Sequence, residues 1–128
     1  MTRRRLLLVL SALLAVLGGT WWTSGRQHLG PAAARLSSAV GPADSARAVG
    51  RAVLPALPAG TDAAHLVLDI ARALNSAPAD LAMLPERDLR ARILETIRSE
   101  HLAGRTVSVQ GWEISATEAR LYALAALR

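Results

Sequence analysis

The first 22 residues, MTRRRLLLVLSALLAVLGGTWW, set the strongest limit on what this chain can fold into. Three arginines at positions 3–5 precede the apolar run Leu6–Leu17, and two glycines follow the run. This three-part order is typical of an export signal. A segment that enters a membrane takes no part in a soluble core, so about 100 residues remain, enough for one small domain.

The fate of this leader (residues 1–22) is open between retention and cleavage. Val16-Leu17-Gly18 is a weak substitute for the usual Ala-x-Ala cleavage motif. Extended to Trp22, the apolar run reaches the short limit of a membrane-spanning helix, about 17–25 residues. Trp21 and Trp22 would then lie at the lipid interface, with the arginines held in the cytoplasm. We expect an anchor in the inner membrane, with the rest of the chain facing the periplasm. A cleaved signal peptide, which would release the protein into the periplasm, is the second-ranked alternative.

Two further interpretations of the leader follow from its arginines. The start TRRRLL resembles a twin-arginine export signal, so the export route stays open between the general and the twin-arginine pathways. A buried core helix is the remaining alternative. Three consecutive arginines at its start argue against that alternative, because charged side chains are almost never fully buried unless they are paired.

Net charge points away from nucleic acid. The formal charge is +5, but three of the 15 arginines lie in the leader, and the 12 others face ten acidic residues. Basic and acidic residues alternate along residues 26–128, and no row of aromatic residues offers a stacking surface for bases. We expect no nucleic-acid partner. A cytosolic, arginine-rich nucleic-acid-binding protein remains a lower-ranked alternative.

Cysteine and phenylalanine are both absent, and aromatic residues make up 3% of the chain. Disulfides, thiol nucleophiles and zinc–thiolate sites are therefore excluded. The core has to be built from Leu, Ile, Val and Ala, and the helical periodicity of these apolar residues predicts a mostly α fold. We expect the leader, a flexible linker over 23–42 rich in Gly, Pro, Ser and Ala with one weak helical stretch around Ala32–Val40, and a small domain over 43–128.

The domain is predicted to be a bundle of about three to four helices. The first runs from Pro42 to Pro55, and its internal Gly50 costs about 1 kcal/mol relative to Ala. The second is capped by Thr61 or Asp62 and ends near Leu74. Its apolar face consists of Ala63, Leu66, Val67, Ile70, Ala71 and Leu74.

A third helix is predicted from Pro85 to about Leu102, with Gly104 as its terminator. Its apolar stripe consists of Leu89, Ile93, Leu94 and Ile97. The period then changes in RTVSVQGWEIS (105–115), where apolar residues alternate with polar ones on both sides of a Gln-Gly pair. This pattern predicts a short β-hairpin before the last helix.

The last helix is predicted to begin with a capping box, Ser115-Ala116-Thr117-Glu118. The Ser115 hydroxyl accepts from the Glu118 backbone N–H, and the Glu118 carboxylate accepts from the Ser115 N–H. The alternative, Ser115 or Thr117 as a nucleophile, lacks an adjacent base and any known nucleophile motif. We therefore predict a structural role for Ser115 and Glu118.

The tail GRTVSVQGWEISATEARLYALA (104–125) resembles the C-terminus of small uncharacterised bacterial proteins that carry an export signal. Their shared pattern is GRTVxVxGWxxSxTEARL, and VGRAVLPALP (49–58) resembles them more faintly. The resemblance implies a small exported domain and brings no activity with it. It marks as most characteristic the residues Gly111, Trp112, Ser115, Glu118, Ala119 and Arg120.

One candidate partner surface stands out: Arg105, Trp112 and Arg120. Trp and Arg are the residues most enriched in the energetic centres of protein interfaces. In the alternative interpretation, Trp112 pins the hairpin against the helices and both arginines are merely solvated.

Other sites find little support in the sequence. His65 and Asp69 are one helical turn apart, but a third metal ligand is missing. Glu113 or Glu118 could serve a small periplasmic enzyme as an acid or base, which is the second-ranked function. We expect no catalytic residue, metal or cofactor. The leading hypothesis is a binding or accessory module, held to the membrane by residues 1–22, with a protein partner in the cell envelope.

Overall fold

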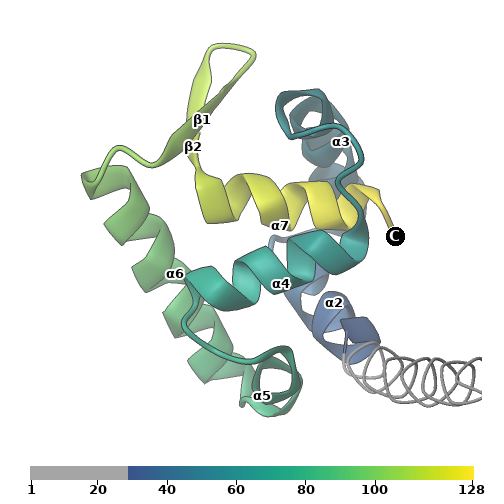
Figure 1. Cartoon of the computed structure of the whole chain (residues 1–128), viewed down its shortest axis with the longest axis vertical. Helices are drawn as coiled ribbons and strands as arrows, with labels where there is room; N and C mark the ends of the chain where they lie inside the picture. Colours follow the sequence, from purple (N-terminus) through teal and green to yellow (C-terminus); the bar gives the residue numbers. More distant parts are fainter. Residues whose placement is uncertain (1–28) are drawn as a thin grey trace, which may run out of the picture.

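The computed structural model of the protein describes residues 29–128 (Figure 1). The leader and residues 23–28 of the predicted linker lie outside the described residues. The described chain forms α2 (Leu29–Ser38), α3 (Ala43–Val53), the 3-10 helix η1 (Leu54–Ala56), α4 (Ala63–Ala73), α5 (Pro78–Met83), α6 (Glu86–Leu102), β1 (Thr106–Val109), β2 (Trp112–Ser115) and α7 (Ala116–Ala126). The prediction of a mostly helical fold with a hairpin before the last helix is confirmed. Within residues 29–128, no helix combines the length and the hydropathy that a membrane span requires.

Helix α7 forms the centre of the domain. It contacts α2, α3, α4, α6 and both strands, and it runs across the middle of the bundle in Figure 1. A helix that is surrounded in this way needs small or apolar residues on nearly every side. Its buried residues are Thr117, Ala119, Leu121, Ala123, Leu124 and Ala125.

Helix α3 packs directly on α7 through Gly50. A Cβ atom at position 50 would lie 2.0 Å from the backbone oxygen of Tyr122 and 2.8 Å from the Cβ of Ala126. The two helix backbones can therefore approach this closely only because residue 50 has no side chain. The sequence predicts that Gly50 weakens the helix, but its main role in the structure is this close contact.

Helices α4 and α6 follow the predicted apolar faces with one exception. On α4, Leu66, Val67 and Ile70 are buried, and the carboxylate of Asp62 caps the helix by accepting from His65 N at 2.8 Å. On α6, Leu89 and Ile93 are buried, whereas Leu94 is 55% exposed, so its place in the core stripe was predicted wrongly. Leu94 lies 100° around the helix from Ile93, on the side that no neighbouring helix covers.

Residues 29–38, predicted as part of the flexible linker over 23–42 with only a weak helical stretch around Ala32–Val40, form helix α2. Ala32 and Leu36 are fully buried in the common core, and Arg35 Nη1 donates to the Leu81 carbonyl at 2.9 Å. The flexible-linker prediction is therefore wrong for this stretch, and the domain begins before residue 43. The sequence indicated only a weak helix here because alanines and two leucines carry little hydrophobic pattern. Small side chains nevertheless let a helix approach its neighbours closely.

Candidate functional site

The predicted partner surface divides into two places in the structure. Arg105 and Arg120 line one hollow between α4, α6 and α7. Trp112 is not among the residues that line this hollow and lies instead near the turn of the hairpin. The three residues therefore do not form one continuous patch, and each place has to be considered separately.

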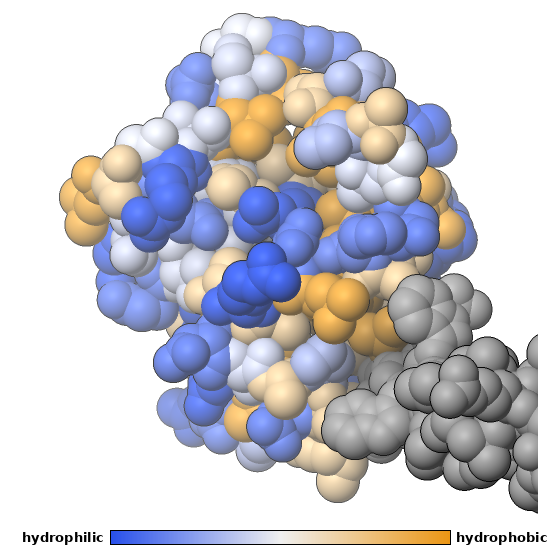
Figure 2. Space-filling model, viewed as in Figure 1, coloured by the Kyte–Doolittle hydropathy of each residue, from blue (hydrophilic) through white to orange (hydrophobic). Residues whose placement is uncertain are grey.

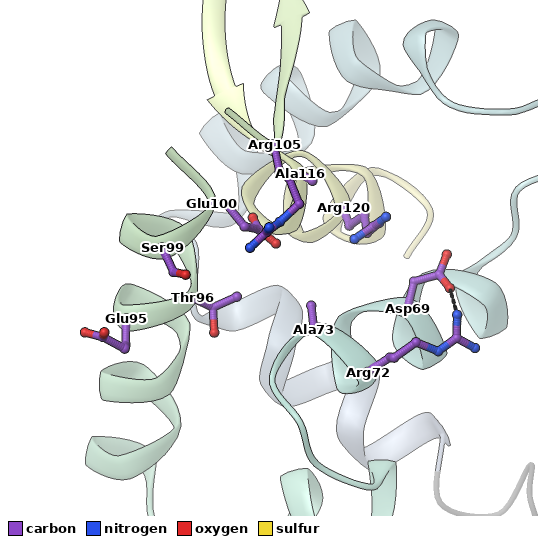
Figure 3. A pocket seen from close by; sticks show the side chains of 10 residues that line it. All are labelled: Asp69, Arg72, Ala73, Glu95, Thr96, Ser99, Glu100, Arg105, Ala116 and Arg120. Atoms are coloured by element: carbon purple, nitrogen blue, oxygen red, sulfur yellow. Dashed lines mark ion pairs between the residues drawn. The ribbon is translucent and has the colours of Figure 1, made fainter. Parts of the chain in front are cut away.

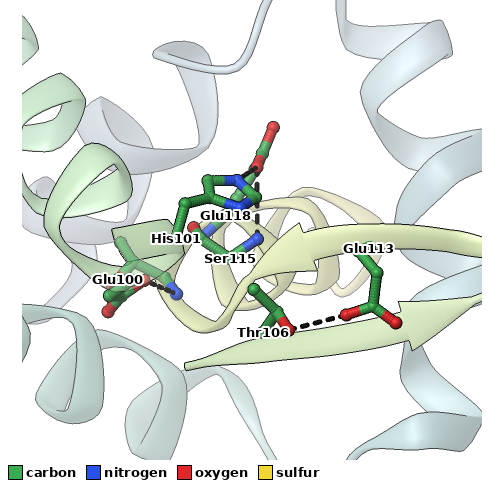
Figure 4. Close-up of polar contacts among 7 residues, drawn as sticks. Glu100, His101, Thr106, Glu113, Ser115 and Glu118 are labelled. Atoms are coloured by element: carbon green, nitrogen blue, oxygen red, sulfur yellow. Dashed lines mark hydrogen bonds and ion pairs between the residues drawn. The ribbon is translucent and has the colours of Figure 1, made fainter. Parts of the chain in front are cut away.

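The hairpin that carries Trp112 is well defined. Strands β1 and β2 pair antiparallel, with Val107 opposite Ile114 and Val109 opposite Trp112. Gln110 and Gly111 both have positive φ angles, 50° and 83°, as the two central residues of a type I′ turn require. At the open end, Thr106 Oγ1 donates to Glu113 Oε2 across the strands at 2.6 Å (Figure 4). The hairpin holds Trp112 in a fixed position.

Trp112 does not pin the hairpin against the helices, as one interpretation of the sequence proposed. It is 76% exposed, although it shares a face of the hairpin with the buried Val109. In Figure 1 the hairpin rises from the start of α7, and its tip projects away from that helix, which accounts for the exposure of Trp112 next to the turn. On the face drawn in Figure 2, apolar residues form small patches separated by polar ones.

The capping box at the start of α7 is confirmed. Ser115 Oγ accepts from Glu118 N at 3.0 Å, and Glu118 Oε2 accepts from Ser115 N at 3.4 Å (Figure 4). The Nε2 atom of His101, at the end of α6, lies 3.8 Å from the same Oε2 atom of Glu118. Ser115 is fully buried and occupied by this bond. This environment supports a structural role for its hydroxyl.

The sequence suggested Glu100 only as an acid–base pair with Glu95 and did not predict its structural role as a carboxylate that is only 4% exposed. Its Oε2 accepts from Thr117 N at 2.8 Å, and its Oε1 accepts from Thr117 Oγ1 at 2.6 Å. Glu100 therefore caps α7 from the neighbouring helix α6, where a negative charge also meets the positive end of the α7 dipole. Glu100 lies seven residues, or two helical turns, after Ile93, and therefore on the buried side of α6. This spacing was the signal in the sequence that could have identified Glu100 as a buried residue.

The hollow beside Glu100 has a volume of about 450 Å³ and is lined by charged residues from several elements. In Figure 3, the Arg105 side chain reaches from the base of the hairpin toward Glu100, and Arg120 extends from α7 toward the Asp69–Arg72 pair. Its ten lining residues are Asp69, Arg72, Ala73, Glu95, Thr96, Ser99, Glu100, Arg105, Ala116 and Arg120. The arrangement can bind a charged group but contains no nucleophile with an adjacent base.

The residues named for enzymatic alternatives are engaged in other interactions. Glu113 is exposed and accepts from Thr106, while Glu118 belongs to the helix cap. His65 and Asp69 line a second hollow of about 300 Å³, where the His65 ring nitrogen Nδ1 lies 2.7 Å from Asp62 Oδ1. Within residues 29–128, no three His, Cys, Asp or Glu side chains are grouped to hold a metal ion.

Comparison with known proteins returned no match, whether to family models, to curated proteins or to solved structures. The resemblance of residues 104–125 to small exported bacterial proteins stays a prediction. The function is therefore inferred from the geometry of the domain and from the sequence of the leader.

Proposed function

We propose that this protein is a small helical module that is anchored in the membrane or exported, and that it acts by binding a protein partner in the cell envelope. In this proposal it is a non-catalytic accessory on the periplasmic side. The pattern of residues 1–22, a basic start followed by an apolar run and tryptophans, supports this location.

The observation that carries the proposal is the exposure of Trp112 next to the type I′ turn of the hairpin. Tryptophan brings a large apolar area to an interface, and burying it on binding is a common source of affinity. Because the type I′ turn already fixes the backbone, little conformational entropy is lost when a partner covers the ring. An exposed, preorganised indole of this kind is suited to fill a pocket on another protein.

The position of the hairpin favours a protein partner over the lipid surface. Figure 1 shows the hairpin tip at one end of the domain and the start of α2 near the other. A chain anchored through residues before α2 would hold the tip away from the membrane. Trp112 would then face the periplasm, where a larger envelope complex could bind it.

A tagged full-length chain, recovered from solubilised membranes, tests the proposal. We expect the native protein to bring down a defined partner, and Trp112→Ala to lose it. Leu102→Ala is the matched control, because Leu102 is an apolar residue that is 86% exposed at the end of α6. Equal recovery by the native protein and Trp112→Ala, or a protein that is recovered alone in several detergents, would contradict the proposal.

A further inference from the structure

The geometry points to a second binding site that is independent of the hairpin tip: the hollow between α4, α6 and α7 binds a single carboxylate group through Arg105 and Arg120. Both guanidinium groups reach into the hollow from different elements (Figure 3). Neither forms an ion pair with any residue in the part of the chain that the structure describes. Two cationic side chains that form no ion pair among the described residues thus line one open space, Arg105 on the side of Glu100 and Arg120 on the side of Asp69.

The other charges at the hollow are already engaged. Asp69 Oδ1 lies 3.6 Å from Arg72 Nη1, and Glu95 Oε2 lies 3.7 Å from Arg98 Nη1. In Figure 3 the Glu95 carboxylate points away from the hollow, on the far side of α6. These two pairs leave Arg105 and Arg120 as the cations that are available to a ligand.

Glu100 limits the charge that the hollow accepts. Its buried carboxylate lines the same hollow, close to Arg105 in Figure 3, and accepts hydrogen bonds from Thr117 at both of its oxygens. Two guanidinium groups and one carboxylate leave one net positive charge. A doubly charged phosphate would be repelled by Glu100, whereas a singly charged carboxylate would balance the site.

Arginine also suits a carboxylate in shape. The planar guanidinium presents parallel N–H groups that match the two oxygens of a carboxylate, and such bonds are stronger than neutral ones. A volume of about 450 Å³ leaves room for a small molecule or for the last residues of a peptide. Hydroxyls of Thr96 and Ser99 on the wall can bond to the remainder of the ligand. The ligand is either a free small carboxylic acid or the C-terminal carboxylate of a peptide.

Nuclear magnetic resonance of the full-length chain in a non-ionic detergent tests this site. The probes are N-acetylalanine, acetyl-trialanine with a free C-terminus, its C-terminal amide, and inorganic phosphate. We expect both free acids to shift the side-chain signals of Arg105 and Arg120 saturably, and the amide to leave them unchanged. Equal affinity of the two acids would identify a small acid as the ligand, and much tighter binding of the tripeptide would identify a peptide C-terminus.

Substitutions separate this site from a general attraction of anions. Arg105→Gln and Arg120→Gln should each weaken binding about tenfold or more, as expected for a lost charge-assisted hydrogen bond. Arg105→Lys keeps the charge and should still weaken binding, because it loses the paired donors. Arg47→Gln, which removes the same charge from α3, should have no effect. The proposal is overturned if no saturable shift occurs, if phosphate binds more tightly than the acids, or if Arg47→Gln weakens binding equally.

Discussion

At position 50, the absence of a side chain brings α3 and α7 into direct backbone contact. From the sequence alone, Gly50 is expected only to destabilise its helix, because glycine has a low helix propensity. Its value depends on Tyr122 and Ala126, which lie more than 70 residues further along the chain. No local pattern could reveal that contact.

Gly50→Ala should therefore destabilise the domain by about 1–3 kcal/mol or more, because the added methyl group has no space beside the Tyr122 carbonyl. Chemical denaturation of the full chain measures the change. Gly30→Ala is the matched control: residue 30 is also helical, and a Cβ there would meet no atom of residues 29–128 within 4 Å. It should be neutral or stabilise by up to about 1 kcal/mol. A neutral Gly50→Ala would contradict the close contact.

Tyr122, the single tyrosine of the chain, offers a prediction about pH. Partial burial raises the pKa of its phenol above the usual value of about 10, and the nearby charge of Glu118 raises this pKa further. The folded state thus holds the proton more tightly than the unfolded state does. The stability that this provides is present below pH 10 or so and is lost as the pH rises through the folded pKa.

Ultraviolet absorbance of the phenolate measures this titration without interference from another tyrosine. We expect a midpoint above about 10 in the native protein. In Glu118→Gln the midpoint should move back toward the usual value, and the fold should persist because glutamine also serves in a capping box. A native midpoint at or below 10 would show that the ring is fully solvated.

Among the elements, α4, α6, the hairpin and α7 could be predicted because local signals specify them. Asp62 and Ser115 cap helices, Gly104 ends α6 with a positive φ angle, and Gln110-Gly111 form the turn. Helix α2 was predicted only as a weak helical stretch inside a linker, because its stability depends on tertiary contacts of Ala32 and Leu36. The burial of Trp112 could not be predicted either. The alternation of apolar and polar residues in the strand is the same whether or not helices cover the hairpin tip.

Loss of the capping box should weaken α7 at its start. Ser115→Ala removes the acceptor for Glu118 N and should cost about 1 kcal/mol in the free energy of unfolding. Ser108→Ala, on the exposed side of β1, is the control and should change stability by less than about 0.5 kcal/mol. If the two variants unfold at the same denaturant concentration, the cap contributes nothing measurable.

The hydrogen bonds between Glu100 on α6 and Thr117 on α7 should contribute more to stability than the exposed Glu95–Arg98 ion pair does. Glu100→Gln replaces a charged acceptor of two hydrogen bonds and should cost about 1.5–3 kcal/mol. Glu95→Gln, on the exposed side of the same helix, should stay within about 0.5 kcal/mol. Combining Glu100→Gln with Thr117→Val should cost less than the sum of the two changes. Strict additivity would mean that the two side chains act independently.

For the molecule as a whole, we propose that residues 1–22 export or anchor a helical domain that carries an exposed tryptophan on its hairpin. The size of the core is modest, and α7 holds it together by contacting most of the other elements. The sequence predicted the mostly helical fold and the hairpin before the last helix but not the division of the candidate surface, because the separation of Arg105 from Trp112 depends on the length of the hairpin.

Site-specific photo-crosslinking in intact cells tests the central claim most directly. A photoreactive residue replaces Trp112 at the hairpin tip in one variant and Met83, which is 84% exposed at the end of α5, in the other. The account predicts a discrete crosslinked species in the envelope fraction from position 112 and none from position 83. The same crosslinking pattern from both positions, or a full-length chain found only in the cytosol, would contradict it.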